Sequence, residues 1–132
     1  MQVTVTVSYT GAQSSSTADS HNGGNGTGTG SQSVDITTVA DNCWVFSVLS
    51  QAGSTNNPTA GNTSRWEANV GAFADSAGED TNGPKTPAGI QAMSWTVAAG
   101  SQNWTISAAS FAPGSGGGGS TDHFLSLLGV GI

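Results

Sequence analysis

The acidic stretch at residues 75–83 (DSAGEDTNG) is the densest group of side chains that could do chemistry. Asp75, Glu79, Asp80 and Asn82 would place three carboxylates and an amide in one expected loop, residues 75–89. Oxygen ligands of this kind suit a hard cation such as calcium. The spacing fits no EF-hand, however, and exposed acidic loops commonly serve solubility only. We therefore expect no metal and no cofactor, with calcium as the alternative.

Two tryptophans, Trp66 and Trp95, are candidates for stacking on sugar rings, since each has Asn, Thr or Asp residues not far away in the sequence. An indole combines a large apolar surface with a polar N–H, which suits that role. Each nevertheless lies on the alternating apolar side of a predicted strand, where a core position is the more common outcome. Glycan binding at Trp66 and Trp95 is kept as an alternative.

No residue pattern in the chain indicates catalysis. Cys43, the single cysteine, lies in the most apolar run and is interpreted as a small buried hydrophobe. His21 and His123 are far apart and have no zinc-ligand spacing around them. The sequence also contains no nucleophile elbow of the Gly-x-Ser-x-Gly type and no phosphate-binding loop. The prediction is that the protein is not an enzyme.

Charge excludes two classes of partner. Of 132 residues only 8% are charged, the net charge is −6, and Arg65 and Lys85 are the only lysine or arginine residues. Binding to nucleic acid or to an anionic membrane requires clustered basic side chains, so we expect neither partner. No apolar run reaches the length of a membrane span.

The remaining elements must be organised around residues 42–50 (NCWVFSVLS), the most apolar run. In an extended strand Trp44, Phe46 and Val48 share one side, whereas Val45 and Leu49 share the other. A strand that is apolar on both sides belongs inside a sandwich or beneath a neighbouring subunit.

Alternation of apolar and polar residues predicts the other strands. They are expected at residues 2–9, 31–38, 64–73, 90–98 and 103–111, and the last two form a hairpin through residues 99–102. Residues 10–30, 51–58 and 75–89 read as loops because Gly, Ser, Asn and Pro dominate them. The predicted fold is an all-β antiparallel β-sandwich, Ig-like or jelly-roll-like, over residues 1–113.

The end of the chain is a second apolar region. Residues 114–122 are predicted to be a Gly-rich linker, and residues 123–132 an apolar arm or closing strand. We favour an arm that inserts into a neighbouring subunit by strand addition. The expected subunit-interface residues are Phe124, Leu125, Leu127, Leu128 and Val130. This tail, from its own chain or a neighbour's, is expected to cover the Val45 and Leu49 side of the central strand.

Four short segments resemble a β-sandwich unit of tailed-phage structural proteins: residues 38–45 (TVADNCWV), 58–61 (PTAG), 83–89 (GPKTPAG) and 108–113 (AASFAP). The ending FLSLLGVG at residues 124–131 is similar to chain ends of small virion proteins. The resemblance implies a capsid decoration or tail-associated subunit and supplies no catalytic residue.

The expected function is therefore non-enzymatic assembly through strand edges and the C-terminal tail, with itself and other virion proteins as partners. The alternative is a lectin-like module that binds glycans. No secretory signal is recognised at the start of the sequence, which agrees with a virion assembled in the host cytoplasm; the alternative location is an extracellular surface.

Overall fold

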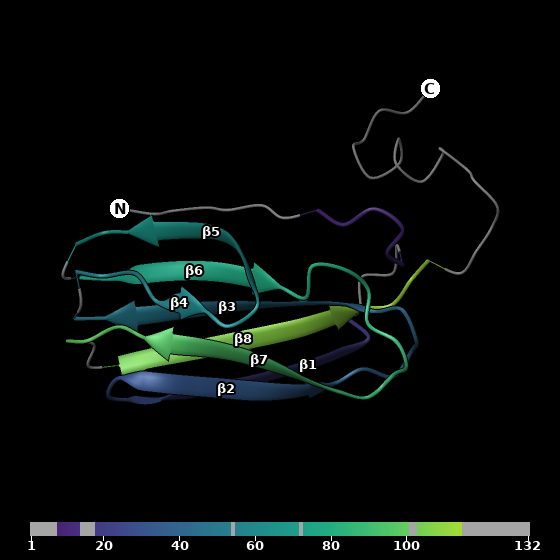
Figure 1. Ribbon diagram of the computed structural model, residues 1–132, viewed down its shortest axis with the longest axis horizontal. Coiled ribbons are helices and arrows are strands. Elements are labelled where there is room, and N and C mark those ends of the chain that lie inside the picture. The colour runs from purple at the N-terminus through teal and green to yellow at the C-terminus, as the bar shows by residue number, and fades with distance from the viewer. Residues whose placement is uncertain (1–7, 14–17, 54, 72, 101–102, 115–132) are drawn as a thin grey trace, which may run out of the picture.

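Antiparallel strands in two facing sheets form the body of the protein (Figure 1). The computed structural model describes residues 8–13, 18–53, 55–71, 73–100 and 103–114. The larger sheet has the order β1-β8-β3-β6-β5 and the smaller sheet the order β2-β7-β4. Their bounds are β1 Ser20–Thr27, β2 Gly30–Thr37, β3 Trp44–Ala52, β4 Thr59–Ala60, β5 Thr63–Asn69, β6 Asp75–Asp80, β7 Ile90–Val97 and β8 Asn103–Phe111. The prediction of an all-β antiparallel sandwich is confirmed.

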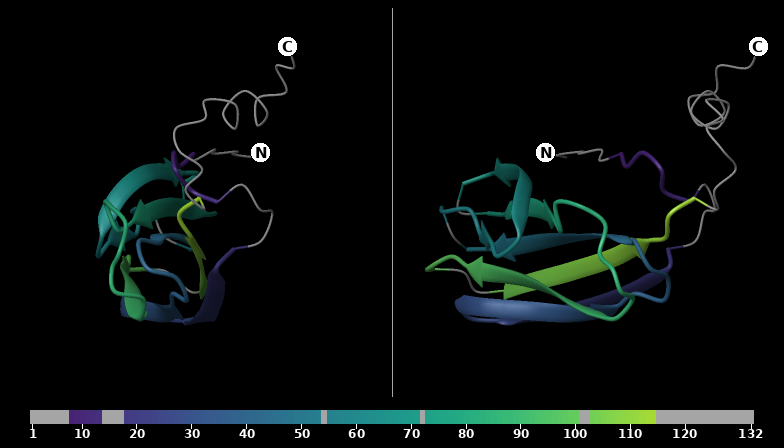
Figure 2. Two further views of the ribbon diagram at one scale, coloured as in Figure 1. Left: turned by 90° about the vertical axis from the view of Figure 1, so that its right-hand side faces the viewer. Right: turned by 45° about the vertical axis from the view of Figure 1, so that its right-hand side comes forward.

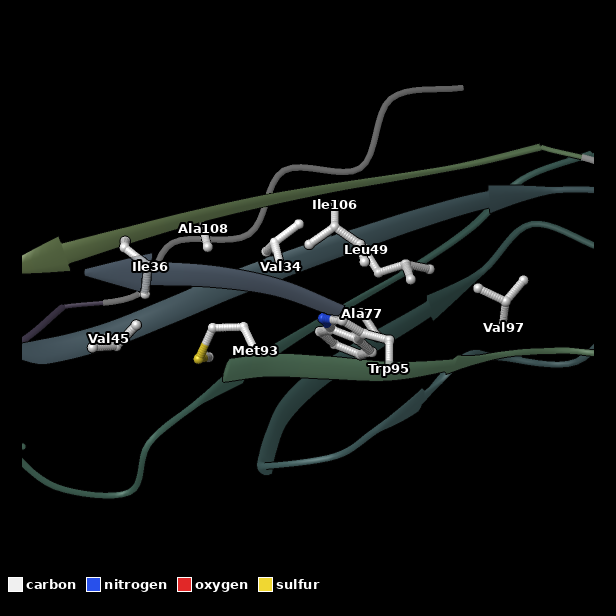
Figure 3. Packing of buried hydrophobic residues seen from close by; sticks show 10 residues of the cluster. All are labelled: Val34, Ile36, Val45, Leu49, Ala77, Met93, Trp95, Val97, Ile106 and Ala108. Atoms are coloured by element: carbon white, nitrogen blue, oxygen red, sulfur yellow. The ribbon is translucent and has the colours of Figure 1, made fainter. Parts of the chain in front are cut away.

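The core lies between the two sheets, which Figure 2 shows stacked over each other. Inward-pointing side chains alternate with outward ones along each strand, as a sandwich requires. Figure 3 shows how these side chains meet. The buried cluster consists of Val34, Ile36, Val45, Leu49, Ala77, Met93, Trp95, Val97, Ile106 and Ala108. The strands predicted at residues 31–38, 42–50, 64–73, 90–98 and 103–111 correspond to β2, β3, β5, β7 and β8.

Strand β1 corrects the prediction of one long loop at residues 10–30. Residues 20–27 (SHNGGNGT) pair along their whole length with β8. The glycines of β1 leave space for a neighbour, because a Cβ added at Gly26 would lie 2.7 Å from Cζ2 of Trp104. A glycine in a strand often marks such a close approach. Positive φ angles at Gly28 (90°) and Gly30 (99°) then form the short link into β2.

Strand β6 corrects the prediction of a loop at residues 75–89. Its six residues (DSAGED) lie between β3 and β5 in the larger sheet. Acidic residues and glycine have low strand propensity, but pairing on both sides outweighs it. The acidic side chains are tolerated because each is hydrogen-bonded. Asp75 accepts hydrogen bonds from Nε2 of Gln51 over 3.4 Å and from the backbone N–H of Val70 over 3.3 Å, and the bonds of Glu79 and Asp80 belong to the clusters described below.

The predicted hairpin between residues 90–98 and 103–111 is wrong. Strand β7 pairs with β2 and β4, whereas β8 pairs with β1 and β3 in the other sheet. The chain therefore passes from one layer to the other between β7 and β8 instead of turning between neighbouring strands. A short connection can join two neighbouring strands of one sheet or two strands of facing sheets. Apolar and polar residues alternate in the same way in both cases, so the pattern does not distinguish them.

The Val45 and Leu49 side of β3 does not face the tail as predicted. Both side chains are fully buried in the core between the two sheets. The opposite side of β3, with Trp44, Phe46 and Val48, is half-buried and points away from the smaller sheet. The linker from residue 115 and the arm at residues 123–132 lie outside the described residues.

Among the described residues, no helix has the length and apolar character needed to cross a membrane.

Candidate functional site

The outward side of the larger sheet carries a cluster of aromatic side chains, which we call the outer aromatic face. It comprises Tyr9, Trp44, Phe46, Trp66 and Phe111. The ring of Tyr9 lies over the others at one end, with centroid distances of 5.0 Å to Trp44, 6.5 Å to Phe46 and 6.1 Å to Phe111. Separations of this size are typical of favourable aromatic pairs. The face is therefore an ordered apolar surface.

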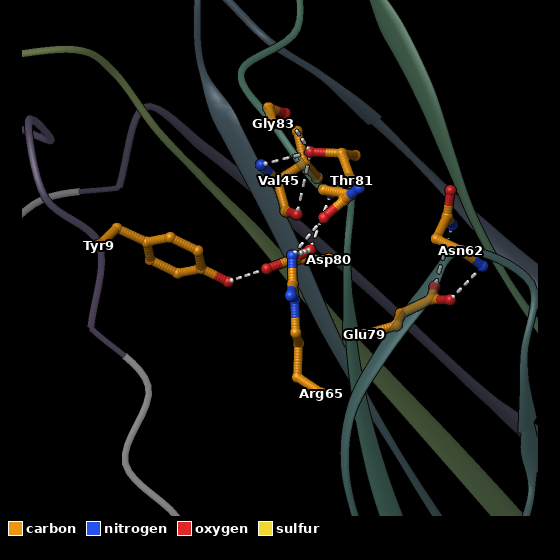
Figure 4. Close-up of polar contacts among 9 residues, drawn as sticks. Tyr9, Val45, Asn62, Arg65, Glu79, Asp80, Thr81 and Gly83 are labelled. Atoms are coloured by element: carbon orange, nitrogen blue, oxygen red, sulfur yellow. Dashed lines mark hydrogen bonds and ion pairs between the residues drawn. The ribbon is translucent and has the colours of Figure 1, made fainter.

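A polar cluster holds Tyr9 in place on this face (Figure 4). The Tyr9 hydroxyl donates a hydrogen bond of 3.2 Å to Oδ2 of Asp80. The other carboxylate oxygen of Asp80 lies 2.8 Å from Nη2 of Arg65 and accepts a hydrogen bond of 2.8 Å from the backbone N–H of Asn82. The carboxylate is therefore held from three directions.

Electrostatics favour this cluster with Asp80 ionised. Burial by itself would raise the pKa of Asp80, but hydrogen bonds from Arg65, Asn82 and Tyr9 and the Arg65 charge outweigh burial and lower the pKa. Burial and the neighbouring Asp80 charge raise the pKa of Tyr9, so its phenol stays protonated and remains a donor. The three side chains thus form a stable charge-assisted contact near neutral pH.

Trp66 lies on the same outward side because β5 contains a bulge. The register between β5 and β6 shifts between Ser64 and Trp66, so Arg65 is an extra residue there. A bulge re-aims side chains, and both Arg65 and Trp66 lie on the Asp80 side of the sheet. The Trp66 indole covers Gly78, where an added Cβ would lie 2.8 Å from Cε2 of the indole. Trp66 thus remains a candidate surface residue.

Trp95, the second predicted glycan residue, is a core residue instead. Its side chain is 1% exposed, and its Nε1 donates a hydrogen bond of 3.0 Å to Oγ of Ser47. Ser47 in turn donates to Oε1 of Glu79 over 3.0 Å. A side chain so deeply buried between two sheets cannot stack on a sugar, so Trp95 occupies the core position that alternation favours and the glycan-binding alternative does not hold there.

The carboxylates considered as an alternative calcium site, Asp75, Glu79 and Asp80, do not converge. On strand β6, Asp75 and Glu79 point into the sandwich, whereas Asp80 points to the outer aromatic face. Asp75 and Glu79 are four residues apart, which corresponds to about 13 Å along a strand. Within the described ranges, no group of three or more His, Cys, Asp or Glu residues has metal-binding geometry.

Glu79 instead accepts hydrogen bonds from neighbouring residues inside the sandwich. Its Oε2 accepts a hydrogen bond of 2.7 Å from the backbone N–H of Asn62, and its Oε1 accepts one of 3.2 Å from Nδ2 of Asn62. Burial raises the pKa of Glu79, and the hydrogen bonds from Asn62 and Ser47 offset this only in part. The buried polar cluster links strands of both sheets, and Figure 4 shows Glu79 and Asp80 on opposite sides of β6.

Cys43 is buried and has an unreactive environment. Its thiol donates to the backbone carbonyl of Ala40 over 3.0 Å. Burial and the nearby charge of Asp19 raise the pKa of the thiol to about 11. The thiolate, which is the nucleophilic form, is therefore scarce at neutral pH. This environment agrees with the interpretation of Cys43 as a small apolar residue.

Sequence reasoning missed the contribution of Tyr9 and Asp80 to the outer aromatic face. The sequence pattern predicts a strand at Tyr9 and a loop at Asp80. The signal that was present is the aromatic side of β3, where Trp44 and Phe46 alternate with the core residues. That pattern predicts that another part of the chain packs on the outer side of β3 as well. The predicted interface residues Phe124, Leu125, Leu127, Leu128 and Val130 lie outside the described residues, and their role stays a prediction.

Comparison with known proteins gives no relative on which to base an assignment: no protein-family model, no curated protein and no solved structure matches this chain. The fold and the geometry of the chain itself therefore carry the functional argument.

Proposed function

We propose that the protein is a non-enzymatic assembly subunit, which associates with copies of itself through strand edges and its C-terminal tail. The resemblance described above suggests the setting, a virion in which the subunit decorates the capsid or belongs to the tail. Its partners would then be identical subunits and other virion proteins.

The observation that carries this proposal is the free edge of β1. This strand lies at the end of the larger sheet and pairs only with β8 among the described strands. Its eight residues include no Lys, Asp, Glu or Pro. Proteins that remain monomeric usually protect an edge strand with such residues, because an edge offers unpaired backbone groups to another chain. An edge without this protection favours strand pairing between subunits.

The contacts of the acidic residues support a structural role over a catalytic one. Glu79 and Asp80 are buried and bonded to neighbouring donors, and Asp19 accepts backbone hydrogen bonds from Val39 and Ala40 at 2.8 and 3.2 Å. These carboxylates hold strands and links together. A general acid or base needs free access to a substrate proton, which these positions do not offer.

Light scattering on purified protein tests the proposal. The full chain is expected to give a mass that is a multiple of 13.0 kDa. Deleting residues 114–132 and the separate change Asn25→Lys on β1 should each reduce that mass. Thr105→Lys is the matched control, because Thr105 pairs with Asn25 but lies on the inner strand β8. A full chain that stays monomeric at every concentration would refute the proposal.

A second candidate, carbohydrate binding, rests on Trp66 alone. The indole lies on the outer aromatic face beside the Arg65 and Asp80 ion pair, and such pairs of aromatic and polar groups are suited to sugar rings. Binding on a glycan array that is lost in Trp66→Ala but retained in Phe73→Ala would support it. Phe73 is a fair control because it is an aromatic side chain that is 85% exposed.

A further inference from the structure

The outer aromatic face is covered incompletely by the described part of the chain. On the inner side of the larger sheet, Val45 and Leu49 have no exposed surface because the smaller sheet packs on them. On the outer side, Trp44, Phe46 and Val48 are all half-buried, and no described strand lies over them. An apolar surface of this kind favours a covering element.

Tyr9 shows where the chain reaches this face. Its ring packs on Trp44, Phe46 and Phe111, and its hydroxyl is bound to Asp80. The residues that follow Tyr9 are fixed as well. Gly11 accepts a hydrogen bond of 2.8 Å from the N–H of Gly114, and the N–H of Gln13 donates to the carbonyl of Ala112 over 2.8 Å. The chain is therefore anchored at the edge of the face.

The residues before Tyr9 have the pattern needed to cover the rest. Val3, Val5 and Val7 alternate with Thr4, Thr6 and Ser8 in the sequence QVTVTVSY. In an extended segment the three valines share the side that Tyr9 presents. At a rise of about 3.3 Å per residue, residues 2–8 span about 23 Å. Residues 46–52 of β3, also seven residues, span about 23 Å on the same basis.

We propose that residues 2–7 lie as an extended strap across the outer aromatic face of their own chain. Val3, Val5 and Val7 face the sheet, and Thr4 and Thr6 face solvent. The occupant is the amino-terminal segment because Tyr9 of the same chain is already bound there, which gives residues 2–7 a very high local concentration. The predicted C-terminal arm, residues 123–132, follows the predicted linker at residues 114–122, and the proposed function assigns it to a neighbouring subunit.

A pair of substitutions in the full chain tests the strap. Val5→Asp places a charge on the side that faces the sheet, whereas Thr6→Asp, the matched control, places it on the solvent side. Val5→Asp should increase binding of the dye ANS and the quenching of tryptophan fluorescence by acrylamide, and Thr6→Asp should leave both unchanged. Equal effects of the two substitutions would contradict a strap with this orientation. Circular dichroism checks that both variants keep the strand content of the parent.

Two deletions identify the occupant. A chain without residues 2–7 should show the same gain in ANS binding, whereas a chain without residues 115–132 should not. If only the second deletion exposes the face, the C-terminal arm is the occupant and the strap is wrong. If the effect appears only on dilution, a second copy covers the face, and the proposal fails as well. These results are independent of the mass measured for the full chain.

Cross-linking tests the position of the strap without removing anything. Val48 lies two residues from Phe46 on the outward side of β3, and Val7 lies two residues from Tyr9. Because Tyr9 packs against Phe46, the proposed strap places Val7 near Val48. A chain with Val7→Cys and Val48→Cys should form an intrachain link with a short bismaleimide. The control pair, Val7→Cys with Ala92→Cys, uses an exposed position on the smaller sheet and should not react. Equal yields for the two pairs would refute the strap, and the native Cys43 does not compete because it is buried.

Discussion

Replacement of Gly78 by alanine gives the sharpest test of the contact between the Trp66 indole and the sheet. A Cβ at this position would lie 2.8 Å from Cε2 and 2.9 Å from Cδ1 of Trp66. Both distances are shorter than packed carbon atoms allow, so the indole must move. Gly78 does not have a positive φ, and the backbone therefore accepts alanine without strain.

The expected cost follows from two opposing terms. Forcing an extra methyl group into a packed contact typically costs about 1–3 kcal/mol. Replacing glycine with alanine at a compatible backbone position returns about 0.4–1 kcal/mol, because the unfolded chain loses freedom. With central values of about 2 and about 0.7 kcal/mol for these terms, Gly78→Ala should lower the free energy of unfolding by about 1.3 kcal/mol. Against a typical total of about 5–15 kcal/mol, this is a measurable loss.

Urea unfolding of four proteins measures the effect: the parent, Gly78→Ala, Trp66→Ala and the double variant. In the Trp66→Ala background the added methyl group meets no indole, so Gly78→Ala should cost nothing there or be slightly stabilising. The difference between the two backgrounds is the coupling energy. Gly114→Ala is a control, since its nearest contact is an ordinary 3.4 Å to the carbonyl oxygen of Ala12. If Gly78→Ala is as stable as the parent when Trp66 is present, the indole does not lie on Gly78.

Two further predictions concern buried titratable groups. Burial raises the pKa of Glu79 above its ordinary 4.5, so the folded protein holds the carboxyl proton more tightly than the unfolded chain does. The parent therefore loses stability as the pH rises from 4.5 through the raised pKa of the folded state. Glu79→Gln lacks this loss. When urea unfolding is followed from about pH 4 to about pH 8, the stability of the variant relative to the parent should therefore increase with pH. Parallel stability profiles for the two proteins would show that Glu79 does not titrate in this way. Since the pKa of Cys43 is raised to about 11, the native protein should react with a thiol reagent at neutral pH only as fast as it unfolds, and fully in denaturant, whereas rapid stoichiometric labelling of the native state would contradict its burial.

Alternation of apolar and polar residues was sufficient to predict the fold class and most of the core strands. Alternation placed Val34 and Ile36 in one strand and Met93, Trp95 and Val97 in another, and these side chains do form the core. This succeeded because a strand that is buried on one side needs apolar residues with a period of two, whichever strand it pairs with.

The roles of residues 20–27 and 75–80 depend on contacts with distant parts of the chain. Both segments lack strand propensity, and they are strands because of what lies beside them: Trp104 against Gly26, and the Trp66 indole against Gly78. The same is true of the candidate residues. Glu79 and Asp80 are adjacent in the sequence, yet one is inside the sandwich and the other binds Tyr9 on its outer side, 71 positions away. Such long-range pairing depends on strand order, which local pattern does not encode.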